Sequence, residues 1–393
     1  MITIGKDNTS NEYLGIVDEK SRAILICGKR GSGKSYTLGV IFEELHAQEN
    51  SLLIVIDPMG IYHTMSEPNL TQERQLWDWG LSSRGLPITI HVPGDPVERY
   101  GGTEVISEMQ RRRVKFQPLR LNPSDLSPDS WCDLFDLSIN DVMGIVLYRA
   151  VQNLRRQRKH FFYVTDIIEE IEHDKKAQER TIEALLNRLA MAMDWDIFST
   201  NYREVWEIFD LNSVNVIDLS VVDPGRYGLR NLIVDVIARD IFNKRTISRR
   251  KEELGLLSDL PKVWMAIDEA HQFIPAGKAS LAKETLIRWV KEGRQPGLSL
   301  ILATQQPAAI DSEVLSQCDV LLVHKLTNTE DTHAINRLSQ DYMNTELRTM
   351  VQKLNRSGEA ILVDDEAETL RTIQIRPRVS QHGGGEARVK NPS

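Results

Sequence analysis

The stretch ILICGKRGSGKSYTLGVIFEEL, residues 24–45, joins an apolar run to a glycine-rich loop and then to a helical pattern. Its loop, GKRGSGKS at 28–35, matches the nucleotide-binding pattern GxxxxGK[ST]. The flanks predict the buried strand and the helix that this motif requires, in which glycine backbone and the positive helix end present N–H groups to phosphates. The stretch therefore predicts a P-loop. The alternative is a glycine-rich strand-to-helix turn that happens to contain a lysine.

The expected ligand of this loop is ATP with Mg²⁺. Lys34 is predicted to neutralise charge on the β- and γ-phosphates, and the Ser35 hydroxyl is predicted to hold Mg²⁺. The predicted nucleotide contacts are Gly28, Gly31, Ser32, Gly33, Lys34, Ser35 and Tyr36.

Short apolar runs rich in β-branched residues recur along the chain, at 23–27, 52–56, 88–92, 214–219, 263–267, 298–303 and 320–326. Several have no polar alternate, which is typical of strands buried on both faces of a parallel sheet. Because helical patterns lie between them, the sequence predicts an α/β fold with a mostly parallel central sheet. The predicted division is a short N-terminal extension (1–21), a first part of the core (22–122), a helical insertion (123–212), a second part of the core (213–378) and a flexible tail (379–393).

The overall charge is acidic, because the 393 residues carry a formal net charge of -8. This excludes a uniformly basic, histone-like surface but not a local basic channel. The three cysteines, Cys27, Cys132 and Cys318, include no CxxC pair, so neither a disulfide framework nor a zinc knuckle is predicted. No apolar run approaches the roughly 18 residues that a membrane span needs, and the start lacks the apolar core of a signal peptide. We expect a cytoplasmic protein without a membrane segment.

A second motif, VWMAIDEAH at 263–271, is an apolar strand that ends in two adjacent carboxylates. Asp268 is predicted to accept Mg²⁺-bound water, and Glu269 is predicted to orient and polarise an attacking water. A site that hydrolyses nucleotide needs this second carboxylate, whereas a small-molecule kinase excludes water. The alternative is a solvated acidic pair at the end of a strand.

Two further residues are candidates for catalysis. Gln305 follows the strand predicted at 298–303, where its amide can contact both the γ-phosphate and the attacking water. Arg294 follows a helix predicted to end near Gly293. An arginine at a helix end is either catalytic or a solvated charge that complements the helix dipole.

Three stretches together resemble the HerA side of the HerA and FtsK superfamily of ring-forming, DNA-pumping ATPases. They are IDEAHQFIP, KEGRQPGLSLILATQQPAAIDSEVLSQCD and LTNTEDTHAI, within residues 267–335. The resemblance extends over most of 22–375. It implies a RecA-like P-loop core with an added strand between the Walker A and Walker B strands, and a homo-hexameric ring around double-stranded DNA.

The resemblance also implies roles for single residues. Lys34 and Ser35 resemble the Walker A pair, and Asp268 and Glu269 resemble the Walker B pair. Gln305 resembles the sensor glutamine of the family. By the same resemblance Arg294 reaches the nucleotide of a neighbouring subunit, so that hydrolysis would depend on ring assembly.

The sequence departs from the family pattern in two places. In IDPMGIYHTM, at 56–65, Asp57, Gly60 and Tyr62 match, but Met59 and Ile61 replace the usual His and Glu. Asp57 is therefore either functional or a turn-forming residue before a proline. Only about 21 residues precede the first expected core strand, so the N-terminal β-barrel on which the NurA nuclease docks in HerA proteins is expected to be missing.

The predicted function is an ATP-driven, hexameric DNA translocase or helicase. We expect it to work with a nuclease partner, NurA-like or another effector, in DNA end processing, repair or defence against phage. The alternatives are a nucleotide-gated ring that serves as a scaffold for an effector, and a peripheral secretion or conjugation ATPase. The candidate DNA contacts, which could equally be solvated charges, are Arg111, Arg112, Arg113 and Lys115.

Overall fold

The computed structural model describes residues 1–48, 51–158, 161–199, 204–223, 228–338, 344–364 and 369–384. Its strands are β1 (Ile2–Asp7), β2 (Tyr13–Ile16), β3 (Ala23–Cys27), β4 (Ser51–Asp57), β5 (Ile88–Pro93), β6 (Val114–Leu119), β7 (Val214–Asp218), β8 (Lys262–Ile267), β9 (Leu298–Thr304), β10 (Val320–Val323), β11 (Glu359–Asp364) and β12 (Thr369–Ile375).

The helices lie between these strands. They are α1 (Lys34–His46), α2 (Glu73–Asp78), α3 (Pro96–Arg99), α4 (Thr103–Arg111), α5 (Pro128–Leu134), α6 (Val142–Arg158), α7 (Val164–Glu172), α8 (Glu179–Asp194), α9 (Leu229–Glu253), α10 (Leu281–Glu292), α11 (Ser312–Leu315), α12 (Thr329–Asn336) and α13 (Asn344–Lys353). None of them, in the part of the chain that the structure describes, combines the length and the apolar composition needed to cross a membrane.

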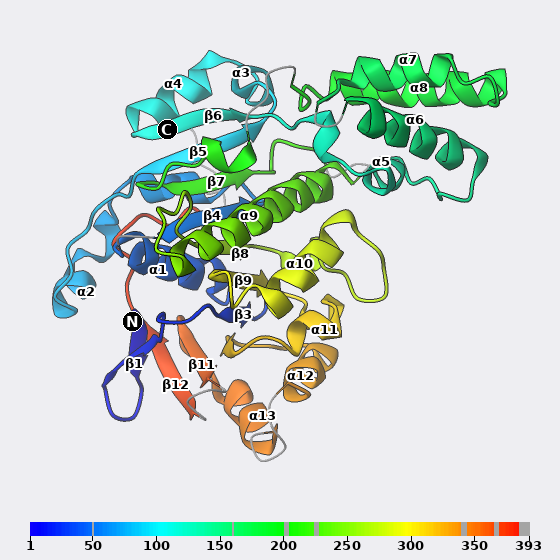
Figure 1. Cartoon of the computed structure of the whole chain (residues 1–393). Coiled ribbons are helices and arrows are strands. Elements are labelled where there is room, and N and C mark those ends of the chain that lie inside the picture. The colour runs from blue at the N-terminus through cyan, green and yellow to red at the C-terminus, as the bar shows by residue number, and fades with distance from the viewer. Residues whose placement is uncertain are drawn as a thin grey trace, which may run out of the picture.

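The strands of the described residues form one sheet in the order β2-β1-β12-β11-β10-β3-β9-β8-β4-β7-β5-β6 (Figure 1). Every neighbouring pair from β10 to β6 is parallel. Each of the seven predicted apolar runs forms a strand of this parallel part. Strand β9 lies between β3 and β8, which is the place that the resemblance assigns to the added strand.

Both faces of the parallel sheet are buried, and β3 shows why its sequence has no polar alternate. Ile24 and Ile26 pack on one face with Leu38 and Ile41 of α1. Leu25 and Cys27 pack on the other face, in the cluster that includes the apolar side of α9. Each fully buried aliphatic side chain contributes about 1.5–3 kcal/mol to the stability of the fold relative to an exposed one. Burial on both faces therefore holds the strand before the P-loop firmly in place.

The two ends of the chain differ from the predicted division. The segment predicted as an extension contributes β1, which pairs antiparallel with β12 and buries Ile2 and Ile4 completely. At the other end, Val379 and Ser380 are buried, so the part of the predicted flexible tail that is described is packed on the core. Both features depend on pairing between distant parts of the chain, which a local pattern does not reveal.

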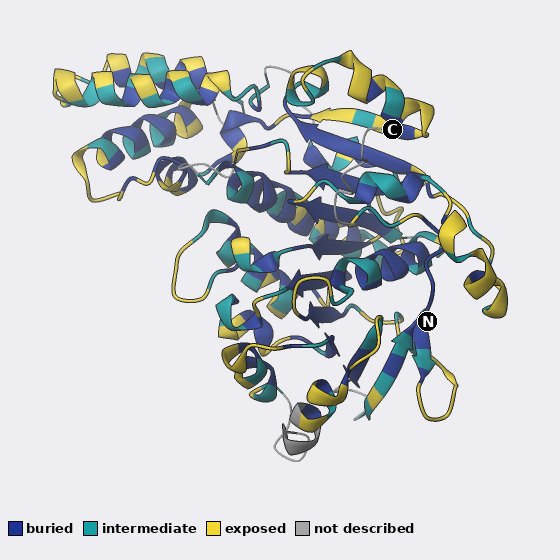
Figure 2. Cartoon of the chain, turned by 180° about the vertical axis from the view of Figure 1, so that it is seen from behind, coloured by how far each residue is buried: buried dark blue, intermediate teal, exposed yellow. Residues whose placement is uncertain are grey.

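The segment predicted as a helical insertion contains α5 to α8. These helices form a lobe beside the sheet (Figure 1), and the outer surfaces of α7 and α8 are largely exposed (Figure 2). The inner surface is apolar, because α5 and α6 share the core cluster that also covers one face of the sheet. The lobe is therefore attached to the core through buried apolar contacts.

Candidate functional site

The glycine-rich loop connects β3 to α1. A Cβ atom on Gly28 would lie 2.6 Å from Cβ of His324 and 2.5 Å from Oγ of Ser32, so only glycine fits there. Gly33, the residue before α1, has a φ of 108°, in the region that favours glycine. The loop therefore turns tightly, and its N–H groups and the N-terminus of α1 form an anion-binding element.

The first two residues of α1 carry the predicted phosphate and metal contacts. Lys34 is buried, and its Nζ donates a hydrogen bond of 3.2 Å to the carbonyl of Lys29. Burial lowers the pKa of this ammonium, while the nearby carboxylates of Glu269 and Asp268 oppose that shift. A desolvated ammonium beside carboxylates gains a strong partner when a phosphate binds.

The carboxylates that follow β8 face the P-loop. Ser35 Oγ donates a hydrogen bond of 3.0 Å to Asp268 Oδ2, and the hydroxyl of Tyr62 donates one of 2.8 Å to the same oxygen. Asp268 and Tyr62 are almost completely buried. The structure thus brings the predicted Walker A and Walker B residues into direct contact, and it adds Tyr62, whose role the sequence did not indicate.

Glu269 has a strained backbone and an unsatisfied side chain. Its φ is 48°, unusual for a residue other than glycine, and such strain is concentrated at functional sites. Its Oε2 atom is buried and has no hydrogen-bond partner among the described residues. Burial, and then the charge of Asp268, raise the pKa of this carboxyl group. A carboxylate held in this way is available to a water molecule.

The residue that follows β9 lies beside the carboxyl group of Glu269. Gln305 follows β9 directly and is half-buried, and its N–H is close enough to Glu269 to lower the pKa of that carboxyl group. His271, in the short helix Ala270–Gln272, lies between the two motifs. Its Nδ1 is 3.2 Å from Thr304 Oγ1 and 3.5 Å from Glu269 Oε2. His271 thus lies beside both Glu269 and Thr304, the residue before the predicted sensor, and this placement depends on the strand order.

Asp57 forms a turn, which was one of its two predicted roles. Its Oδ1 accepts hydrogen bonds from the N–H groups of Met59 and Gly60, and its Oδ2 accepts one from Tyr62. Burial, and then the neighbouring carboxylate of Asp218, nevertheless raise the pKa of Asp57 to about 7. Its hydrogen bond to the N–H of Tyr62 helps to hold that residue against Asp268.

The donor set around Ser35 and Asp268 fits Mg²⁺. The ion prefers hydroxyl, carboxylate and water oxygens, and beside nucleotide phosphates it needs only one or two protein groups. The described residues contain no group of three or more His, Cys, Asp or Glu side chains that could hold a metal ion on their own.

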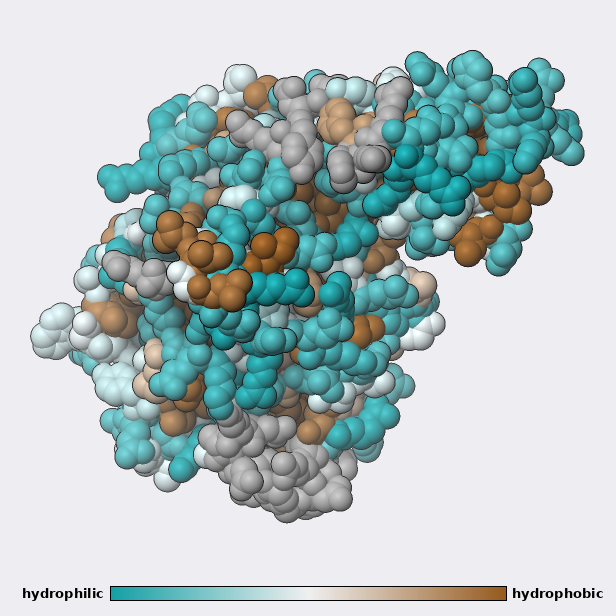
Figure 3. Space-filling view, viewed as in Figure 1, coloured by the Kyte–Doolittle hydropathy of each residue, from teal (hydrophilic) through white to brown (hydrophobic). Residues whose placement is uncertain are grey.

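Arg294 lies at the other end of the sheet. It is exposed and precedes β9, whereas Gln305 follows the C-terminal end of β9 and Glu269 follows the same end of the parallel neighbour β8. Seven residues of strand span about 20 Å, too far for the arginine to reach the P-loop of its own chain. Arg294 lines a cavity of about 1270 Å³. Exposed apolar side chains gather over the C-terminal end of α9 (Figure 3). The exposed residues in and directly after this end of the helix include Ile247, Leu254, Leu256 and Leu257, and the exposed Leu211 lines the cavity itself.

The predicted DNA contacts lie on the opposite edge of the sheet from β2, far from the P-loop in strand order. Arg111 and Arg112, at the end of α4, form ion pairs with Glu108. Lys115 on β6 pairs with Asp210 at 3.1 Å, and Arg113 is exposed. The structure does not bring these residues to the phosphate site, and acidic neighbours offset most of their charge.

Comparison with known proteins identifies relatives over nearly the whole chain. A family model described as the central domain of the HerA helicase matches residues 3–241. A protein of Methanocaldococcus jannaschii described as a probable helicase is 23% identical over 379 residues, which cover 93% of this chain and 64% of that relative. The DNA double-strand break repair helicase HerA of Sulfolobus acidocaldarius is 24% identical over 378 residues, which cover 95% of this chain and 69% of that relative. The chain thus spans roughly two thirds of the length of these curated relatives.

Two solved structures share the fold. VirB4 of Thermoanaerobacter pseudethanolicus aligns with a TM-score of 0.62 at 15% identity, covering 96% of both chains. The bacterial conjugative coupling protein TrwBΔN70 aligns with a TM-score of 0.54 at 12% identity, covering 98% of this chain and 90% of that chain. The likeness confirms the predicted fold class, an α/β P-loop core with a mostly parallel sheet.

Proposed function

Since the chain belongs to the family of the HerA helicase central domain, we propose that it is an ATP-hydrolysing motor that acts on double-stranded DNA as a hexameric ring. The observation that carries the proposal is the convergence of Ser35, Asp268 and Glu269 at the end of the parallel sheet. A glycine-rich turn that binds no nucleotide would not need two adjacent carboxylates beside it, one of which has a buried oxygen without a hydrogen-bond partner among the described residues.

The geometry supports a separate role for each of these residues in hydrolysis. The N–H groups of the loop and the ammonium of Lys34 bind the phosphates, and Ser35 and Asp268 hold Mg²⁺. When bound, Mg²⁺ neutralises the charge that develops on the phosphates. Glu269 orients a water molecule and accepts its proton, while Gln305 contacts the γ-phosphate from the neighbouring strand.

Arg294 is proposed to act on the nucleotide of an adjacent subunit. Its distance from the P-loop of its own chain and its exposure support this assignment. The apolar side chains near the cavity that it lines are suited to cover by a second copy of the chain. An arginine supplied in this way stabilises transition-state charge only after the ring has formed.

Double-stranded DNA and a nuclease are the proposed partners. The curated name of the Sulfolobus acidocaldarius relative, a double-strand break repair helicase, supports DNA as the substrate. Arg111, Arg112, Arg113 and Lys115 remain proposed DNA contacts. The nuclease or other effector, the repair or defence role and the cytoplasmic location also remain proposals.

The decisive experiment measures ATP hydrolysis with and without linear double-stranded DNA, together with the mass of the particle in the presence of nucleotide. We expect strong stimulation by DNA in a particle of six chains, and no stimulated rate in the Glu269→Gln variant. A slow rate of ATP hydrolysis that DNA does not change, together with nucleotide-dependent assembly, would contradict the proposed motor. It would favour a nucleotide-gated scaffold.

A further inference from the structure

A cavity of about 680 Å³ adjoins the P-loop and extends away from it. Gly33, Lys34, Ser35 and Tyr36 form its near wall. Its volume lies within the range of about 300–1,000 Å³ that is typical of small-molecule sites. The far wall comes from the segment around α2 and from residues 374–384, and it includes Gln72, Gln75, Trp79, Gln374 and His382. We call residues 376–384 the C-terminal strap.

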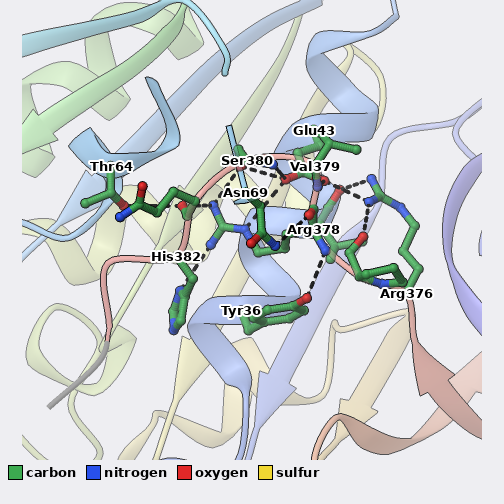
Figure 4. A network of polar contacts seen from close by, with 12 residues as sticks. Tyr36, Glu43, Thr64, Asn69, Arg376, Arg378, Val379, Ser380 and His382 are labelled. Atoms are coloured by element: carbon green, nitrogen blue, oxygen red, sulfur yellow. Dashed lines mark hydrogen bonds and ion pairs between the residues drawn. The ribbon is translucent and has the colours of Figure 1, made fainter. Parts of the chain in front are cut away.

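The C-terminal strap is fixed to α1 by a buried polar network (Figure 4). Arg376 Nη1 donates to Glu43 Oε2 at 2.8 Å, and the N–H of Ser380 donates to Glu43 Oε1 at 2.9 Å. Gly39 makes room for the guanidinium of Arg378, because a Cβ atom there would lie 2.3 Å from its Cζ. Buried hydrogen bonds and close packing therefore anchor the strap to α1, the helix that follows the P-loop.

Tyr36 joins the strap to the phosphate site. Its hydroxyl accepts a hydrogen bond of 2.8 Å from the N–H of Arg378 and donates one of 2.8 Å to Gln72 Oε1. Its ring meets the ring of His382 edge to face, with 5.5 Å between centroids. Because Tyr36 directly follows Ser35, the far part of the cavity begins one residue after the predicted Mg²⁺ ligand.

The far wall has the chemistry of a base-binding site. Trp79 is held in place by an edge-to-face contact with Tyr13 and by the ammonium of Lys6, which lies 4.4 Å from its ring centroid. Aromatic rings stack on nucleic-acid bases, and amide side chains such as Gln75 and Gln374 read the donors and acceptors of a base edge.

We propose that this cavity binds the ribose and base of the nucleotide whose phosphates bind the P-loop, with Trp79 as a stacking surface and the C-terminal strap as the outer wall. The inference rests on the proposed binding of ATP. The far wall of the cavity then distinguishes a nucleotide from a bare polyphosphate.

The test compares the affinity for ATP with the affinity for inorganic tripolyphosphate, both with Mg²⁺, by calorimetry. We expect Trp79→Ala to weaken ATP binding about tenfold and to leave tripolyphosphate binding unchanged. Trp77→Ala is the matched control, because Trp77 is 80% exposed and lies two positions earlier, outside the cavity. It should change neither affinity.

Tripolyphosphate binding also reports that each variant is folded, and Gln374→Ala provides a second variant on the strap side. Unchanged ATP affinity in both Trp79→Ala and Gln374→Ala would overturn the inference while leaving ATP hydrolysis intact. Equal affinity of the unaltered protein for ATP and tripolyphosphate would also overturn it. If the unaltered protein bound neither ligand, the proposed function itself would fail.

Discussion

The hydroxyl of Ser35 donates a hydrogen bond of 3.0 Å to the carboxylate of Asp268, although 233 positions separate the two residues in the chain. The contact exists because β3 and β8 run in the same direction and end at the same edge of the sheet, with β9 between them. The strand order thus assembles the site.

Replacing Glu269 by Gln should abolish most hydrolysis while preserving ATP binding. The amide cannot accept the proton of the attacking water, so we expect kcat to fall by at least about 100-fold. Steady-state hydrolysis and calorimetric ATP binding measure the two effects. Glu253→Gln, at the exposed end of α9, is the control and should keep the full rate. A Glu269→Gln variant with a normal rate would remove this residue from the mechanism.

Replacing Tyr62 by Phe should change the response to Mg²⁺. The variant loses the hydrogen bond of 2.8 Å to Asp268 Oδ2 and keeps the ring, which packs edge to face on Phe42. We expect a higher Mg²⁺ concentration for half-maximal hydrolysis, with kcat at saturating Mg²⁺ much less affected. Tyr13→Phe changes a half-exposed tyrosine and should leave the Mg²⁺ profile unchanged. An unchanged profile in Tyr62→Phe would mean that the tyrosine supports packing alone.

Mixing two inactive variants tests whether Arg294 acts between subunits. Arg294→Ala rings lack the arginine, and Glu269→Gln rings lack the carboxylate, so each alone should hydrolyse ATP poorly. In mixed rings, some interfaces combine an intact Glu269 with an intact Arg294 of the neighbour, and activity should return. Arg288→Ala, an exposed arginine on α10, is the control and should be active without mixing. No recovery on mixing would contradict action between subunits.

Replacing Glu43 by Gln should destabilise the protein strongly. Arg376 and Arg378 are buried beside Glu43, and the neutral amide leaves their charges without this partner. Breaking a buried pair in this way costs about 3–5 kcal/mol. Thermal unfolding measures the loss, and Glu104→Gln, at an exposed position of α4, should have little effect. Equal melting temperatures for Glu43→Gln and the unaltered protein would contradict the buried network.

Stability should fall in mild acid because of His324. The ring is buried, with Nε2 2.9 Å from Thr37 Oγ1 and Nδ1 2.9 Å from the carbonyl of Glu359. Burial lowers its pKa from 6.5 to about 4. The folded pKa lies below the unfolded one, so the stability that neutral His324 contributes is present above pH 6.5 and is lost as the pH falls toward 4.

The full loss from this histidine is about 3 kcal/mol. His324→Gln should therefore flatten the dependence of the free energy of unfolding on pH between 6.5 and 4, as measured with urea. The remaining slope combines two opposite effects. Burial also lowers the pKa of His91 and His382 to about 4, whereas the pKa of Asp57, raised to about 7, favours the folded state as the pH falls. His173→Gln, an exposed substitution, should leave the slope unchanged. If His324→Gln shows the full slope, the acid sensitivity arises elsewhere.

The parallel part of the fold and the phosphate half of the site could be predicted from the sequence. The apolar runs are local, and the P-loop and the acidic pair each lie directly after such a run, so parallel strands bring them to one edge. That Ser35 and Asp268 touch follows from this placement together with the family resemblance.

The remaining features depend on contacts that a local pattern does not encode. Strand β1 is fixed by its pairing with β12, which lies at the other end of the chain. From the sequence, Arg376 and Arg378 would be expected at the surface. In the structure both form buried ion pairs with Glu43 of α1. His271 joins the site only because β9 brings Thr304 to it.

Arg294 precedes β9, and Glu269 follows the parallel strand β8, so the two residues lie at opposite ends of the strands. This placement has a consequence for how activity depends on concentration. Under the proposed arrangement a single chain holds two half sites and no complete one. The rate per chain should then decline steeply on dilution, instead of staying constant as it does for an enzyme whose site lies within one chain. A subunit that lacks both residues should silence two sites rather than one, so a small admixture of it should inhibit out of proportion to its share.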